Sequence, residues 1–146
     1  MGHFITTNPA ARDCEHCGAV EVTGFADGLA YRLSMLPVTS HGELRARIAG
    51  LRTWGLAGDG RPVYRGARLI QARPADSSPV FASHRCSAPI PYEDTNIAFA
   101  AVSVDLVAKW RRPATDGQPS GAEVEVLDLF SAELGARVVA VEPAPF

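Results

Sequence analysis

The chain has 146 residues and a formal net charge of −2, with 47% hydrophobic and 21% charged residues. These values are typical of a globular domain and exclude a chain that is disordered throughout. No apolar run reaches the roughly 18 residues that a membrane-spanning helix needs, and residues 1–12 lack the basic start and apolar stretch of a signal peptide. We therefore expect a cytoplasmic protein, and the pI of about 6.1 argues against a general polyanion binder.

The first third of the chain predicts a hairpin followed by one helix. Asp27-Gly28 lies between two apolar runs, as in a tight hairpin turn, and apolar residues alternate with others over 29–35, which predicts a half-buried strand. A helix is predicted over 41–52, because Ser40 and Glu43 have the spacing of a capping box. The apolar residues of this segment recur at helical spacing, at Leu44, Ile48 and Leu51. Arginines occupy its other faces.

A second strand pair and one further strand are predicted around the middle of the chain. Residues 53–56 and 62–65 flank Gly58-Asp59-Gly60 as a second hairpin would. Residues 80–86 read as a short strand that ends in His84 and Cys86. The proline-rich stretch 88–92 is typical of a stiff linker.

Beyond the linker, the pattern predicts mainly strands. Apolar residues occupy the even positions of 97–110, which indicates a long strand with one wet face over its second half. A loop is predicted over 113–121, and shorter strands over 124–129 and 137–141.

The three cysteines carry the clearest chemical signal. Cys14 and Cys17 have the C-x₂-C spacing of a metal knuckle. His84 and Cys86 are two residues apart on a predicted strand, so both side chains point to the same face. Three thiolates and one imidazole form a common tetrahedral ligand set for structural zinc, and soft thiolates favour zinc over magnesium or calcium. We predict a zinc site formed by Cys14, Cys17, His84 and Cys86.

Other interpretations of the cysteines stay open. They include two inert thiols with a buried Cys86, a redox-active C-x-x-C and an iron–sulfur site. His16 lies inside the knuckle and could replace His84 as a ligand. An odd number of cysteines without a secretion signal speaks against a disulfide framework.

The segments 13–18 and 83–86 together resemble small uncharacterised bacterial proteins that pair an N-terminal C-x₂-C with a later H-x-C. A bacterial source also fits the basic residues, of which thirteen of fourteen are arginine. The general similarity is to zinc-ribbon or zinc-knuckle modules, and this resemblance implies a binding domain. The expected fold is α+β: a strand-rich, zinc-stapled module with one helix over 1–88, then an antiparallel β meander over 89–146, which could also form one continuous domain.

A second candidate site is the arginine-rich stretch 41–73, whose local charge is opposed by an acidic segment, 120–146. Basic side chains interleaved with aromatic ones can grip a phosphate backbone and stack bases. The candidate nucleic-acid-binding residues are Arg45, Arg47, Arg52 and Trp54. A solvated basic face is the competing interpretation.

We expect a non-enzymatic, zinc-stabilised interaction or scaffold protein that contacts a protein partner or a second copy of itself. A nucleic-acid-binding zinc-ribbon regulator is the first alternative. A zinc-dependent hydrolase or deaminase is the second, because His41 and Glu43 form part of the deaminase H-x-E motif, although the order relative to C-x-x-C is reversed.

Overall fold

A computed structural model of the chain describes residues 4–111. Within this range, six strands form one antiparallel sheet in the order β1-β2-β3-β6-β4-β5. The strands are β1 (Ala10–Asp13), β2 (Val20–Ala26), β3 (Leu29–Pro37), β4 (Thr53–Leu56), β5 (Pro62–Tyr64) and β6 (Phe81–Ser83). The helices are α1 (Ser40–Ile48), α2 (Ala67–Ala72) and α3 (Ala100–Trp110), with the 3₁₀ turns η1 (Tyr92–Asp94) and η2 (Ile97–Phe99).

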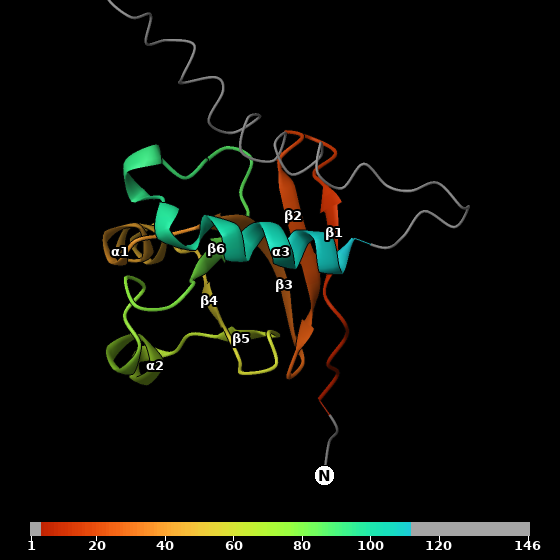
Figure 1. The fold of residues 1–146 in the computed structure, drawn as a ribbon, viewed down its shortest axis with the longest axis horizontal. Coiled ribbons are helices and arrows are strands. Elements are labelled where there is room, and N and C mark those ends of the chain that lie inside the picture. Colours follow the sequence, from red (N-terminus) through yellow and green to blue (C-terminus); the bar gives the residue numbers. More distant parts are fainter. Residues whose placement is uncertain (1–3, 112–146) are drawn as a thin grey trace, which may run out of the picture.

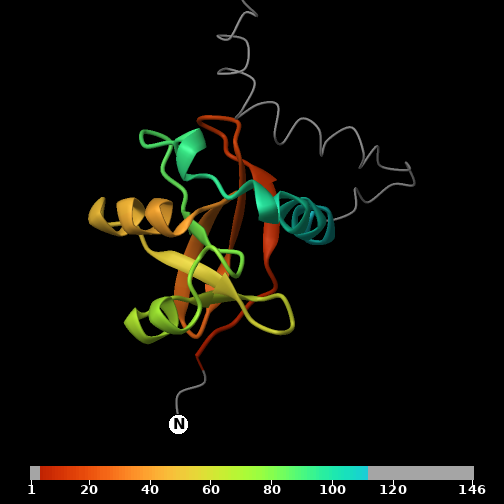
Figure 2. The ribbon, with the colours of Figure 1, turned by 60° about the vertical axis from the view of Figure 1, so that its left-hand side comes forward.

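The sheet curves into an open half-barrel with helices on both sides (Figure 1). Helix α3 crosses one side and contacts β1 and β3, whereas α1 lies on the other side against β4 and β6 (Figure 2). None of the helices within 4–111 is long and apolar enough to cross a membrane. This architecture is strand-rich and agrees with the expected α+β class.

Both predicted hairpins are confirmed. Strands β2 and β3 pair around Asp27 and Gly28, which both have the positive φ that a tight two-residue hairpin turn requires. Strands β4 and β5 form the second hairpin. Strand β6 lies within the predicted range 80–86 and joins the two hairpins, because it pairs with β3 on one side and β4 on the other.

The predicted strand over 97–110 is wrong, because most of this segment is helix α3. The buried side chains recur at helical rather than alternating spacing: Ser103, Leu106, Val107 and Trp110. The Asn96 side chain accepts a hydrogen bond from the Ala98 amide and so begins the helical run. The strand prediction followed the apolar even positions, but odd positions such as Ile97 and Phe99 are apolar too, so alternation alone does not distinguish a strand from a helix here. The polar cap at Asn96 is the signal that favours a helix.

Helix α3 is part of the main core. Its Leu106 and Trp110 pack in one cluster with Val22 of β2, Leu33 of β3 and Trp54 of β4. The Ser103 hydroxyl also donates to the Met35 carbonyl. The division into 1–88 and 89–146 stays a prediction, and the segments 113–121, 124–129 and 137–141 lie outside the described residues.

The helix predicted over 41–52 is confirmed in part as α1, which ends at Ile48, and its cap and buried face also differ from the prediction. Thr39 rather than Ser40 caps the helix, since its hydroxyl accepts from the Gly42 amide at 3.0 Å. Leu44 and Ile48 are 55% and 78% exposed. The helix instead buries Gly42, Glu43 and Ala46. Close approach is the reason, because a Cβ atom at Gly42 would lie 2.6 Å from the Asp94 carbonyl oxygen.

Candidate metal centre

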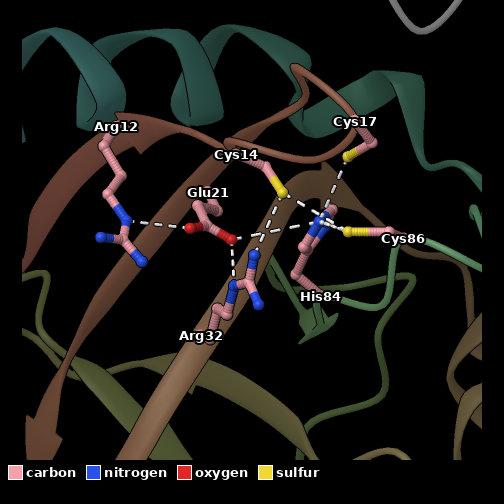
Figure 3. Close-up of polar contacts among 7 residues, drawn as sticks. All are labelled: Arg12, Cys14, Cys17, Glu21, Arg32, His84 and Cys86. Atoms are coloured by element: carbon pink, nitrogen blue, oxygen red, sulfur yellow. Dashed lines mark hydrogen bonds and ion pairs between the residues drawn. The ribbon is translucent and has the colours of Figure 1, made fainter.

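The first cysteine pair lies in the turn between β1 and β2. The Cys14 amide donates to the Ala19 carbonyl and the Gly18 amide donates to the Cys14 carbonyl, both at 2.8 Å. Gly18 has φ of +74°, a left-handed conformation that glycine adopts without steric cost. These bonds close a knuckle that directs both thiols toward the same point (Figure 3).

The second pair follows directly after β6. Ser83 is paired with Leu33 of β3, and the next amide, that of His84, donates to the Arg32 carbonyl at 2.6 Å. Strand β3 lies between β2 and β6 in the sheet. The curved sheet therefore brings together two chain segments whose strands are not neighbours.

The four predicted ligand residues form one cluster. Their donor atoms all lie within 4.8 Å of one another. The Sγ atoms of Cys14 and Cys86 are 3.4 Å apart, and the His84 Nε2 atom lies 3.4 Å from the Sγ atoms of both Cys17 and Cys86. Donors around a tetrahedral zinc ion are separated by about 3.5 to 3.8 Å, given bonds of about 2.3 Å to sulfur and 2.0 Å to nitrogen. The four residues are thus close enough to hold one metal ion.

The alternative ligand His16 is exposed and lies outside this cluster. In the sequence it lies between Cys14 and Cys17. All three cysteines are free thiols, with no disulfide among them.

The cluster has an inner and an outer half. The Cys14 residue is only 2% exposed and the His84 side chain 6%. Cys17 and Cys86 are exposed. The centre therefore lies at the rim of the sheet, with one thiol anchored in the core and two at the surface.

Charged residues that the sequence analysis did not single out surround the inner half. Glu21 is 1% exposed and forms ion pairs with Arg12, at 2.9 Å, and with Arg32. The Arg32 Nη2 atom also donates to the Cys14 Sγ atom at 3.1 Å (Figure 3). The β1–β2 register places Arg12 opposite Glu21, and the β2–β3 register places Arg32 diagonal to it. A hairpin register built on Asp27-Gly28 would have revealed the Glu21–Arg32 pair.

The local hydrogen bonds shift the pKa values of Cys14 and Cys86 in opposite directions. Backbone hydrogen bonds from Cys17 and then His16, with smaller contributions from side chains, lower the pKa of Cys14 to about 6. The neighbouring Cys14 side chain and burial raise the pKa of Cys86 to about 11. Closely spaced thiolates repel one another. A bound cation would take the place of the thiol protons, and its positive charge would offset the negative charges of the sulfur atoms.

The candidate nucleic-acid residues do not form a stacking surface. Trp54 is 0% exposed and packs against the rings of Tyr31 and Tyr64, at centroid distances of 5.3 and 5.7 Å. Its assignment as a base-stacking residue is wrong, because β4 turns its side chain into the core. Arg45 lies 3.4 Å from the buried Asp94.

Two other candidates keep an exposed position. Arg47 donates to the Arg65 carbonyl at 3.1 Å, and Arg52 is exposed next to β4. Another arginine of the basic stretch, Arg65, is fully buried in an ion pair with Glu43. Part of the positive charge of the stretch 41–73 is therefore buried and neutralised by Glu43, and is not available at the surface.

The residues of the partial deaminase motif lie away from the cysteines. The His41 Nδ1 atom is 3.1 Å from the Asp94 carboxylate, and Glu43 binds Arg65. Neither belongs to the metal cluster. Glu43 also does not act as a capping-box residue, since its carboxylate is buried against Arg65 and Thr53.

Comparison with protein-family models, with curated proteins and with solved structures finds no match.

Proposed function

We propose that the chain is a non-enzymatic, zinc-stabilised interaction module, in which Cys14, Cys17, His84 and Cys86 bind one zinc ion. The observation that carries this proposal is the convergence of four donor atoms within 4.8 Å from two segments about seventy positions apart. Three sulfur donors and one imidazole are a ligand set typical of structural zinc. Such an ion would fasten the β1–β2 turn to the end of β6.

A structural rather than catalytic role follows from the number of donors. Four protein ligands complete a tetrahedron, whereas catalytic zinc sites keep one position for water. Neither His41 nor Glu43, the residues that a deaminase interpretation needs, is near the cluster. The contacts therefore favour stabilisation over hydrolysis.

The interaction part of the proposal rests on α1. Leu44 and Ile48 are one helical turn apart, and both project from the surface. Exposed apolar side chains that are neighbours on a helix are common in protein contacts. We propose a protein partner or a second copy of the chain, in the cytoplasm, where thiols stay reduced. The nucleic-acid alternative has less support, because its aromatic residue is buried.

Metal analysis of the full chain tests the proposal. Protein purified without chelator should contain about one zinc ion per chain. Cys14→Ser and His84→Ala should lose most of it, and the matched control His16→Ala should keep it. Protein that contains no zinc and takes up none on dialysis would refute the zinc site, and equal zinc loss in His16→Ala would refute the ligand assignment.

A further inference from the structure

Arg32 joins the thiol cluster to the buried Glu21 carboxylate by hydrogen bonds on both sides, next to the longer 4.0 Å contact between His84 and Glu21. Its Nε atom donates to Glu21 and its Nη2 atom donates to the Cys14 Sγ atom at 3.1 Å. Because a guanidinium group is planar and presents several donors in fixed directions, one arginine can hold both contacts at once. Arg32 thereby fixes the position of the most buried sulfur.

Glu21 in turn fixes Arg32. The carboxylate is 1% exposed, its two oxygens accept from two arginines, and its Oε2 atom lies 4.0 Å from the His84 Nε2 atom. Arg12 makes a similar ion pair with Glu21 but has no contact with a sulfur atom. Both arginines pair with Glu21 and both are partly exposed, but only Arg32 also donates a hydrogen bond to Cys14.

With a divalent ion bound, the charges of the four candidate ligands, Arg32, Arg12 and Glu21 would sum to zero. Three thiolates and one neutral imidazole around such an ion leave one net negative charge. Arg32 supplies one positive charge next to Cys14, while Arg12 and Glu21 offset each other. A monovalent ion would leave the group negative and a trivalent ion would leave it positive. Partial exposure of the Arg32 side chain, 41%, weakens this effect through solvent screening but does not remove it.

We propose that Arg32 is a positioning residue of the metal centre, which orients the Cys14 sulfur and balances the charge of a bound divalent ion. The inference rests on the proposed metal-binding function and names a residue outside the ligand set. Residues behind a metal ligand commonly orient it and tune its affinity for the ion.

The experiment compares Arg32→Gln with Arg12→Gln in the full chain. Each variant removes one ion pair to Glu21, but only the first removes the contact to sulfur. Zinc affinity is measured by competition with a chromophoric chelator. We expect Arg32→Gln to bind zinc roughly ten-fold more weakly, the lower end of the effect for such residues, and Arg12→Gln to stay within about two-fold of the wild type.

Cobalt(II) substitution gives a second measurement, the wavelength of the sulfur-to-cobalt charge-transfer band, which a general loss of stability would not change. Loss of a hydrogen bond raises the electron density on the Cys14 sulfur, so the sulfur-to-cobalt charge-transfer band of Arg32→Gln should shift to longer wavelength. The band of Arg12→Gln should not shift. If Arg32→Gln does not fold, Arg32→Lys and Arg12→Lys carry the same comparison, because lysine cannot hold both contacts in fixed geometry.

Equal affinities in the two variants of either pair, or a cobalt band that does not move in the Arg32 variant, would overturn the inference. Failure of the proposed function looks different, because wild-type protein would then bind neither ion.

Discussion

Within residues 4–111, two glutamates are buried and each binds arginine, but the two clusters differ in the groups that complete them. Glu43 receives two hydrogen bonds from Arg65, at 2.7 and 3.0 Å, and both side chains are almost fully buried. Glu21 binds two arginines whose side chains are about half exposed. The first cluster is completed by Thr53 and by the Arg73 carbonyl, whereas the second ends at a thiol.

The difference separates an ion pair enclosed by protein groups from an ion pair beside a candidate metal ligand. The Nε and Nη2 atoms of Arg65 donate to Glu43 and to the Arg73 carbonyl, so protein groups alone form the Glu43 cluster. The Glu21 cluster is joined through Arg32 to the Cys14 sulfur, which belongs to the candidate metal cluster. The two regions should therefore respond differently to metal.

Metal removal should produce the largest effect. Zinc binding free energy is available as folding free energy, of order 10 kcal/mol in small zinc domains. We expect a chelator to lower the melting temperature of the full chain by tens of degrees or to abolish the transition. Circular dichroism during heating, with and without chelator, measures this effect. Identical melting curves for metal-loaded and chelated protein would contradict a structural role.

Removal of Arg65 should produce the next largest effect, and it should not depend on metal. Arg65→Met leaves the Glu43 carboxylate buried without its cation, which costs about 3 to 5 kcal/mol of unfolding free energy. The control is Arg61→Met, which removes an exposed pair with Asp59 and should cost less than about 1 kcal/mol. Urea unfolding of the zinc-loaded variants gives both values. A zinc affinity that falls with Arg65→Met would show that the two clusters are coupled.

The smallest effect on stability should come from the exposed face of α1. Leu44→Ser and Ile48→Ser should change the unfolding free energy by no more than about 0.5 kcal/mol, since neither side chain is buried. Leu33→Ala is the buried comparison and should cost about 2 to 5 kcal/mol. If α1 is a contact surface, the two serine variants should also weaken self-association in sedimentation experiments. Unchanged association would exclude this face as a contact between copies.

The sequence predicted the ligand cluster and the hairpins better than it predicted the helices. C-x₂-C, H-x-C and Asp27-Gly28 depend on local geometry, so spacing alone is informative. Burial on α1 depends on what the helix meets, and a close contact with η1 selects Gly42 over Leu44. In α3, apolar residues on both alternating positions hid the helical period. The roles of Glu21 and Arg32 required the strand register, which no single motif contains.

X-ray absorption at the zinc edge of the loaded full chain tests the central claim most directly. A structural site formed by Cys14, Cys17, His84 and Cys86 predicts three sulfur neighbours at about 2.3 Å and one nitrogen neighbour at about 2.0 Å. A spectrum with fewer than three sulfur neighbours, or with a light atom beyond the single imidazole nitrogen, would contradict the closed site.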